Sequence, residues 1–347
     1  MKQTEIIIST APLESALEEA DELATEFEVR KVAIEPAMHG QRLDKALVEY
    51  VPEFSRSYVQ QLLAAGLVAL NGKRADKASA KVKVGDKVEI ELRPTPQSQA
   101  FKPEVMDLDV VFEDADVLVI NKPAGLVVHP APGNWSGTLL NGLLARDPVF
   151  SLVPRAGIVH RLDKDTSGLM VVARHREAMD RLVQAMAARE ISRQYLAIAG
   201  KPWVGKPVVT VEAAIGRDPR NRLRMGVVDL TEHAGKTAKT DIHWIGNGRD
   251  GCFVRCVLHT GRTHQIRVHM ASIGHPLLGD SVYGGPGDSG MPRQALHATR
   301  LAFSHPMTGK PMVFTAALPA DMAGVLDGWG VRYNASQDTD TNNAAVK

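Results

Sequence analysis

The densest group of polar side chains in the sequence lies between two apolar runs. Residues 160–168 read His-Arg-Leu-Asp-Lys-Asp-Thr-Ser-Gly, with Ala156–Val159 before them and Leu169–Ala173 after them. A polar loop held between two strands is a rigid support for a catalytic carboxylate, and the candidate is Asp163. The neighbouring Arg161 and Lys164 are expected to lower the pKa of this carboxyl group and keep it charged. The same residues could also form an ordinary solvated turn.

A second group of polar residues, Thr260–His269, follows a predicted strand and opens a predicted helix. Free backbone N–H groups at a helix start, together with Arg262, suit a phosphate group. Arg267 could equally point into the fold and pair with a buried carboxylate. A surface helix with ordinary ion pairs would also account for these residues.

The sequence offers little for a metal or a nucleotide. Four histidines lie close together: His259, His264, His269 and His275. Their spacings of five, five and six differ from the i, i+4 spacing of a helical zinc pair. Cys252 and Cys256 would point to the same face of a strand, which fits the core better than a metal site. The glycine-rich stretch 284–290 lacks the Lys-Ser/Thr of a phosphate-binding loop. We therefore predict no metal and no cofactor.

The tetrapeptide Arg-Leu-Asp-Lys occurs twice, at residues 42–45 and at residues 161–164. The first copy continues with a helical pattern, on which Asp44 can face water. The second copy continues into a turn. Four residues do not identify a site by themselves, so the surrounding structure must decide which copy carries chemistry.

Two units of different size must position these residues, because 347 residues suggest two domains. Residues 41–93 combine two helical patterns with hairpins that turn at Asn71-Gly72 and Gly85-Asp86, which indicates a small domain. Residues 105–330 mix strands and helices without strict alternation, which favours an α+β fold with a mostly antiparallel sheet. The clearest strand signals are Val117–Ile120, Leu169–Val172, Tyr195–Ile198 and Phe253–Leu258.

Three further segments connect or flank these units. Residues 1–40 hold nine acidic and three basic residues, and 13–27 has the periodicity of an acidic amphipathic helix. That helix could dock on the body, bind a partner or remain a mobile arm. Residues 94–104 are predicted to be a linker. The tail, 334–347, has no periodicity and is predicted to be disordered.

The formal net charge of +1 is distributed unevenly. Residues 41–100 hold ten basic and seven acidic residues, a balance that fits a polyanionic partner only weakly. No apolar run approaches the ~20 residues that span a bilayer. The first residues, Met1–Glu5, do not resemble a secretory signal. We predict a soluble cytoplasmic protein that is a monomer and has no membrane partner.

Several motifs in order resemble the RluA-type family of RNA pseudouridine synthases, and most closely its large-subunit ribosomal RNA branch. The resemblance covers residues 41–330, and its longest parts are Asn121–Pro130, Gly157–Leu169 and Gly261–His269. The small unit resembles an S4 RNA-binding domain through Arg42-Leu43-Asp44, Ser55-Arg56 and Val68–Gly72. The implied architecture is an S4-like RNA-binding domain followed by a pseudouridine synthase catalytic domain.

The resemblance implies that uridine in RNA is isomerised: the N1–C1′ bond breaks, the uracil turns, and the ring rejoins through C5. Asp163 matches the family's essential aspartate, and Arg267 matches the arginine that pairs with it. Tyr195 matches the tyrosine that stacks on the uracil and could help to remove the C5 proton. Arg161 matches an arginine that enters the RNA helix when the base leaves. Whether Asp163 attacks C1′ or removes a proton from C2′ is open.

Further residues are assigned through the same resemblance. Other polar residues of the two motifs are expected to bind substrate: His160, Thr166, Arg262, His264 and Gln265. Basic residues of the small domain are expected to bind RNA: Arg42, Lys45, Arg56, Lys73 and Arg74. The expected partner is large-subunit ribosomal RNA or a pre-ribosomal particle. The alternatives are the same chemistry on transfer RNA, or a non-enzymatic RNA-binding assembly factor.

Overall fold

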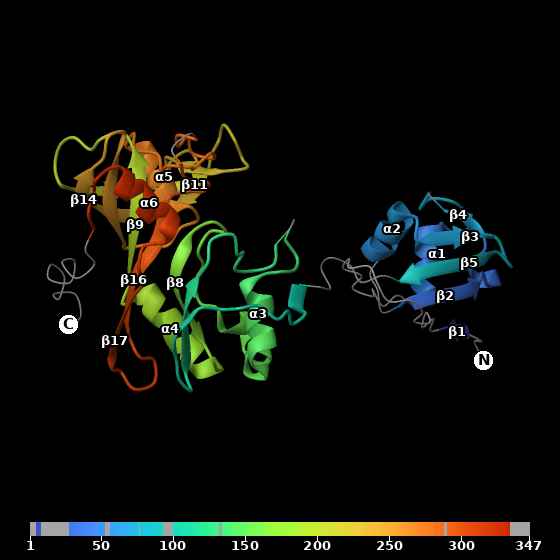
Figure 1. Ribbon diagram of the computed structural model, residues 1–347. Helices are drawn as coiled ribbons and strands as arrows, with labels where there is room; N and C mark the ends of the chain where they lie inside the picture. The colour runs from blue at the N-terminus through green and yellow to red at the C-terminus, as the bar shows by residue number, and fades with distance from the viewer. Residues whose placement is uncertain are drawn as a thin grey trace, which may run out of the picture. The chain divides into compact units, whose positions relative to one another are not determined.

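The computed structural model describes residues 5–7, 28–52, 56–75, 77–92, 100–131, 134–287 and 290–333. It divides the chain into two compact units, Met1–Ala100 and Phe101–Lys347 (Figure 1). The predicted acidic helix and the predicted disordered tail lie outside the described residues. Most of the predicted linker does so as well.

The small unit packs two helices against a five-stranded sheet. Its elements are β1 (Glu5–Ile7), β2 (Glu28–Ala33), α1 (Leu43–Tyr50), α2 (Arg56–Ala65), β3 (Val68–Leu70), β4 (Lys73–Arg74) and β5 (Lys87–Leu92). The sheet order is β1-β2-β5-β3-β4, and neighbouring strands are antiparallel. Each helix buries one apolar stripe, for example Leu43 with Leu47 and Val59 with Leu63, as its helical spacing predicts.

Two details of this unit differ from the prediction. Strand β2 pairs with β5 along its whole length, so the domain begins before residue 41. The turn at Asn71-Gly72 forms as predicted, with positive φ at both residues. The second predicted hairpin does not form, because Val82 exchanges backbone hydrogen bonds with Gly40 and Gln41 instead of pairing with β5.

The large unit is built on one mixed sheet of nine strands. Its order is β10-β14-β15-β9-β16-β8-β7-β6, and β17 pairs with β16. Among the described strands of this sheet, β16 and β8 form the one parallel pair, which confirms the predicted mostly antiparallel sheet. The strands are β6 (Val110–Glu113), β7 (Val117–Lys122), β8 (Ser167–Ala173), β9 (Ser192–Gly200), β10 (Val208–Glu212), β14 (Lys239–Asn247), β15 (Gly251–Leu258), β16 (Leu296–Ser304) and β17 (Pro311–Thr315).

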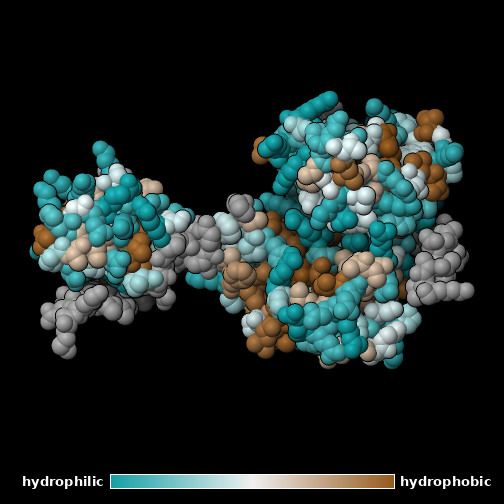
Figure 2. Space-filling view, turned by 180° about the vertical axis from the view of Figure 1, so that it is seen from behind, coloured by the Kyte–Doolittle hydropathy of each residue, from teal (hydrophilic) through white to brown (hydrophobic). Residues whose placement is uncertain are grey.

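Helices cover this sheet, and a small second sheet stands beside it. The helices are α3 (Leu139–Arg146), α4 (Arg176–Ala188), α5 (Gln265–Ser272) and α6 (Ala320–Gly328). The second sheet contains β11 (Ile215–Arg217), β12 (Met225–Val227) and β13 (Gly235–Lys236). None of the helices in the described ranges has the length and apolar character that crossing a bilayer requires. Figure 2 shows a mostly hydrophilic surface with hydrophobic residues in small groups, as is normal for globular proteins.

The core lies on the central strands. Every residue of β8 is buried, and Cys252 and Cys256 of β15 are fully buried within one apolar cluster, which confirms the prediction that they share a core-facing side. At the start of β8, Gly168 has a φ of +117°, and a Cβ there would stand 2.3 Å from the Ala298 carbonyl oxygen. Only glycine lets β8 approach β16 this closely where the polar loop enters the sheet.

The large unit begins earlier than predicted. The Asn141 side chain donates to the Lys102 carbonyl oxygen at 2.8 Å, and the Glu104 N–H donates to the Asn141 carbonyl oxygen at 3.0 Å. These bonds fasten residues 102–104 to α3. The linker predicted at 94–104 therefore ends before Lys102.

Candidate active site

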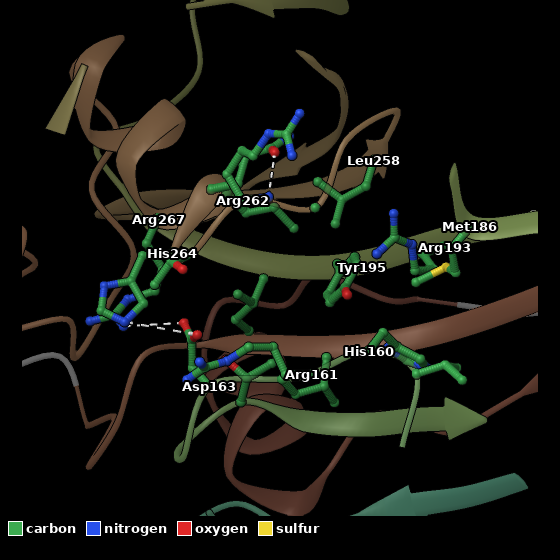
Figure 3. A pocket seen from close by; sticks show the side chains of 18 of the residues that line it. His160, Arg161, Asp163, Met186, Arg193, Tyr195, Leu258, Arg262, His264 and Arg267 are labelled. Atoms are coloured by element: carbon green, nitrogen blue, oxygen red, sulfur yellow. Dashed lines mark hydrogen bonds and ion pairs between the residues drawn. The ribbon is translucent and has the colours of Figure 1, made fainter. Parts of the chain in front are cut away.

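One cavity of about 400 Å³ brings together the two groups of polar residues that the sequence singled out. The loop before β8 forms one wall, and the segment between β15 and α5 forms another (Figure 3). Strand β9 lies between β15 and β16, and β16 pairs with the start of β8, so the sheet order places both loops at one end of the sheet.

The Asp163 carboxylate faces this cavity with 16% of its side chain exposed. Its Oδ2 accepts a hydrogen bond from Arg267 Nη1 at 3.2 Å, and its Oδ1 lies 3.8 Å from His264 Nε2. The backbone carbonyl of Asp163 accepts from the Thr166 N–H at 3.1 Å, which fixes the turn. The carboxylate is therefore held in place but keeps most of its lone-pair sites free.

Arg267 makes two pairings, one with a buried carboxylate and one with Asp163. It pairs with the buried carboxylate of Asp280, through Nε at 2.7 Å and Nη2 at 2.9 Å, while Nη1 reaches Asp163. Its guanidinium carbon lies 5.0 Å from the ring centre of Tyr283. Burial disfavours its charge, but the hydrogen bonds and charge of Asp280 raise the pKa of Arg267, so it remains a cation beside Asp163.

His264 and Tyr195 complete the surroundings of Asp163. His264 adopts a left-handed conformation with a φ of +56°, which is uncommon outside glycine and often found at functional sites. Its Nδ1 lies 2.8 Å from the Tyr283 hydroxyl, and burial lowers the pKa of His264. Tyr195 lines the cavity from β9 with only 5% of its surface exposed. Burial raises the pKa of Tyr195, so its hydroxyl stays protonated at neutral pH.

Comparisons with known proteins agree with this geometry. The family model for RNA pseudouridylate synthase matches residues 116–272, and the S4 domain model matches residues 41–88. Ribosomal large subunit pseudouridine synthase D of Neisseria meningitidis serogroup A is 46% identical over 317 residues, covering 88% of this chain and 82% of that protein. The Escherichia coli K12 protein of the same name is 45% identical over 302 residues, covering 83% and 90%. The chain belongs to the RNA pseudouridylate synthase family.

Solved structures of family members share the fold. Human RNA Pseudouridylate Synthase Domain Containing 1 aligns with a TM-score of 0.54 at 26% identity, covering 67% of this chain and 94% of that one. Human RNA Pseudouridylate Synthase Domain Containing 4 aligns with a TM-score of 0.51 at 21% identity, covering 65% and 94%. The predicted family and the predicted fold, an S4 domain followed by a pseudouridine synthase domain, are confirmed.

Two of the residues expected to bind substrate hold the walls of the synthase cavity. The Gln265 Oε1 accepts from the Thr260 hydroxyl and the Arg262 N–H, and its Nε2 donates to the Lys239 carbonyl and the Thr240 hydroxyl. The four bonds use the hydrogen-bonding capacity of the amide, which favours a positioning role for Gln265 in the cavity wall, and its contact with substrate stays a prediction.

Thr166 is almost fully buried in the wall of the cavity. It is 2% exposed, and its hydroxyl accepts from Gln294 Nε2 at 3.3 Å. Its backbone closes the turn at Asp163. The other predicted residues, His160, Arg161 and Arg262, line the cavity with Asp163. Arg161 is exposed, whereas Arg262 Nε donates to the Thr237 carbonyl oxygen at 3.1 Å.

The Lys122 ammonium group is hydrogen-bonded to the loop that carries Asp163, although the sequence predicted no role for this lysine. It is 1% exposed, and its Nζ donates to the carbonyl oxygens of Pro123, Leu126 and Lys164 at 2.7, 2.9 and 2.9 Å. Three acceptors match the three donors of an ammonium group. Burial lowers the pKa of Lys122 to about 7.

Asp280 and Tyr283 were also missed by the sequence analysis. Asp280 is one of 40 acidic residues, and nothing in its neighbourhood marks it as the partner of Arg267. The signal was indirect: a buried arginine on α5 requires a buried carboxylate, but its position in the chain depends on the tertiary fold.

One group of potential metal ligands occurs in the described ranges, at Asp114, Asp116 and His305. None of these residues lines the cavity. The Nδ1 of His305 accepts from the N–H groups of Met307 and Thr308, so the neutral ring carries its proton on Nε2, 3.0 Å from Asp114. A nitrogen that donates to a carboxylate offers no lone pair to a metal. The group is a hydrogen-bonded turn.

The small unit corrects the expectation for Asp44, which is fully buried and does not face water. Its carboxylate accepts five hydrogen bonds, from Arg42, Arg56 and Gln60, because α2 covers this side of α1. Arg42 and Arg56 remain half exposed, but this carboxylate already balances part of their charge. The other basic residues predicted to bind RNA are exposed: Lys45, Lys73 and Arg74.

Proposed function

We propose that this pseudouridine synthase isomerises uridine in large-subunit ribosomal RNA, with Asp163 as its catalytic group. The observation that carries the proposal is the position of this carboxylate. Of the described residues that line the cavity, Asp163 alone carries a carboxylate, and it is directed at His264 and Arg267 in the cavity that Tyr195 also lines (Figure 3). Arg267 holds it through one hydrogen bond and leaves it open to a ligand.

A single carboxylate is sufficient for this reaction. The isomerisation adds no water and changes no oxidation state, whereas glycoside hydrolases use two carboxylates on either side of the sugar. Asp163 starts either by attacking C1′ or by removing the C2′ proton, and both routes need a charged carboxylate at the ribose. The uracil then rejoins the sugar through C5, and the C5 proton is released.

The position of the cavity requires the target base to leave its stack. Flipping a base out of a helix costs a few kcal/mol, because stacking and pairing are lost. Arg161 is exposed at the cavity and suits the role of filling the gap that the base leaves. The Tyr195 ring suits stacking on the flipped uracil.

The choice of ribosomal RNA rests on two kinds of support. The two relatives named above carry the name ribosomal large subunit pseudouridine synthase D. The S4 unit presents exposed basic residues, including Lys45 and Lys73, that suit RNA phosphates. We further propose a cytoplasmic monomer, since residues of one chain suffice to line the cavity, and we expect a mass near 37.6 kDa by light scattering.

The substrate is tested by incubating the protein separately with large-subunit ribosomal RNA and transfer RNA transcripts. Carbodiimide adducts of pseudouridine stop reverse transcriptase, so new stops identify each modified position. We expect discrete stops in ribosomal RNA with the wild type and none with Asp163→Asn. Stops in transfer RNA alone would overturn the proposed substrate, and no stops in either RNA would overturn the proposed reaction on free RNA.

A further inference from the structure

The cavity extends beyond the residues that surround Asp163. Figure 3 shows Arg193, Met186 and His160 at the opposite end, with Tyr195 between them and Asp163. We propose that this end is a second subsite, in which Arg193 and His160 bind a phosphate group of the substrate strand next to the flipped uridine. The proposal rests on the proposed function, because it takes RNA as the ligand.

Arg193 is a cation for which the described part of the chain supplies no carboxylate partner. Its Nε is buried and has no hydrogen-bond partner among the residues that the structure describes, and within those ranges it forms no ion pair. Its Nη1 lies 2.8 Å from the position that a Cβ would occupy at Gly261, so the guanidinium packs closely against that loop. A buried cation is costly unless an anion or several acceptors satisfy it. The complementary group is therefore expected from a ligand.

His160 adds a second unsatisfied donor. Its Nε2 accepts from the Val171 N–H at 3.1 Å, so the neutral ring carries its proton on Nδ1. That Nδ1 is buried and, within the described ranges, has no partner. Burial and the nearby charge of Arg193 lower the pKa of His160 to about 3, which keeps the ring neutral. A neutral donor beside a cation calls for an acceptor with negative charge.

The charges around the cavity favour a phosphate over a base. Among the described residues, five arginines and one carboxylate line it, and Arg267 is already balanced by Asp280 and Asp163. A uracil carbonyl could accept hydrogen bonds but would leave the charge of Arg193 uncompensated. A phosphodiester accepts hydrogen bonds and also carries the negative charge. Met186 and Leu258 stand beside this end, and apolar neighbours that exclude water strengthen a charged contact.

The backbone of the substrate can also reach this position. A flipped nucleotide rotates about its own backbone, so the phosphates on either side of the target uridine move toward the cavity with it. Tyr195 and Arg193 are two residues apart on β9 and point to the same face of the sheet. A ring stacked on Tyr195 therefore brings one flanking phosphate within the range of a long arginine.

The first test measures RNA binding as a function of salt for the full-length protein. A contact to one phosphate of a single strand contributes about 0.7 to the slope of log K against log salt. Arg193→Gln should lower the slope by about this amount and lower kcat/KM by about tenfold. Arg193→Lys keeps the charge and should keep most of the slope. Arg249→Gln, on an exposed turn where Arg249 pairs with Asp250, is the matched control and should change neither.

The second test locates the phosphate, and its decisive measurement uses the wild-type protein. Ribosomal RNA is ethylated at random on its phosphates, and RNA bound by the wild type is separated from unbound RNA. Bound RNA should lack ethyl groups at one phosphate that flanks the modified uridine. With Arg193→Gln, ethylation at that phosphate should be tolerated. Binding by the wild type that is indifferent to ethylation at both flanking phosphates would overturn the subsite.

These outcomes separate the subsite from the proposed function. If the wild type binds RNA with an Arg193-dependent slope but forms no pseudouridine, the subsite stands and the proposed function fails. If the wild type forms pseudouridine while Arg193→Gln matches it in slope and kcat/KM, the subsite fails and the function stands. If the wild type does not bind ribosomal RNA, both fail.

Discussion

The same tetrapeptide, Arg-Leu-Asp-Lys, occurs in both units of the molecule and has opposite surroundings in them. In the small unit, Asp44 is fully buried, and its carboxylate accepts five hydrogen bonds. In the large unit, Asp163 keeps 16% of its side chain exposed and accepts one side-chain hydrogen bond, from Arg267. The first carboxylate has no capacity left for a ligand, and the second has most of its capacity free.

The difference arises from which arginine reaches the aspartate. In the first copy, Arg42 precedes α1 and bends back to Asp44 two residues away, where its hydrogen bonds hold the pKa of Asp44 well below its usual range. In the second copy, Arg161 stays at the cavity, and the partner of Asp163 comes from α5, 104 residues away. A short motif therefore does not define a site until the tertiary structure determines its partners.

Weakening the support of Asp163 should have the largest effect. Asp280→Asn removes the charge that orients Arg267, so Arg267 and Asp163 shift relative to the substrate. A displacement of about 1 Å at a reacting group can cost about 10²-fold in rate, and we expect a loss of kcat of this size with RNA affinity unchanged. Single-turnover kinetics would measure it. The control is Asp180→Asn, which breaks an exposed pair with Arg176 on α4. Equal kcat in both variants would show that Asp280 does not orient Arg267 for catalysis.

Asp44, the buried aspartate of the first tetrapeptide, is expected to affect stability alone. Asp44→Asn leaves Arg42 and Arg56 without their shared carboxylate, and we expect the free energy of unfolding of the small unit to fall by about 2 kcal/mol. Urea denaturation would measure the loss, with Glu49→Gln on the exposed side of α1 as the control. At saturating RNA, turnover should remain at the wild-type rate. A loss of turnover in the folded variant would contradict the separation of roles.

The stability from Asp44 should also depend on pH. The pKa of Asp44 is lowered in the folded state, so below about pH 5 the unfolded chain takes up a proton that the folded chain does not. This part of the stability is complete above about pH 5 and is lost as the pH falls. The difference in melting temperature between wild type and Asp44→Asn should therefore shrink from pH 6 to pH 3. A difference that stays constant over this range would show that folding does not lower the pKa of Asp44.

The smallest expected effect is on RNA binding, when the lysine of each tetrapeptide is replaced. Lys45 is exposed on the small unit, so Lys45→Gln should weaken RNA binding uniformly and lower the salt slope by about one, without changing kcat. The Lys164 backbone carbonyl accepts a hydrogen bond from Lys122 Nζ, and the Lys164 side chain is exposed, so Lys164→Gln should leave the loop intact. Filter binding at several salt concentrations would compare them. A fall in kcat for Lys45→Gln would contradict a purely RNA-anchoring role.

The sequence was sufficient where a feature is local or belongs to a long motif. The helical stripes of α1 and α2, the Asn71-Gly72 turn and the core-facing cysteines follow from spacing and turn chemistry. The motifs around Asp163 and Arg267 were expected to cooperate, and the sheet order brings them into one cavity.

The sequence was insufficient where a polar group chooses its partner through the fold. Nothing local shows that α2 covers Asp44, that Asp280 neutralises Arg267, or that Lys122 holds the Lys164 carbonyl. Gln265 was expected to contact substrate because of its motif, but its four hydrogen bonds tie α5 to β14 and the preceding loop. Buried polar groups must be paired, yet the pairing is a property of the tertiary structure.

The most direct test is tritium release from large-subunit ribosomal RNA labelled at C5 of uridine, without added metal or nucleotide. Wild type, Asp163→Asn, Asp44→Asn and Asp165→Asn are compared at saturating RNA and at a temperature where all four are folded. Asp165 lies two residues from Asp163 in the same loop and is the matched control. We predict release by all except Asp163→Asn. Release by Asp163→Asn, or its loss in folded Asp44→Asn, would contradict the assignment of catalysis to the second tetrapeptide.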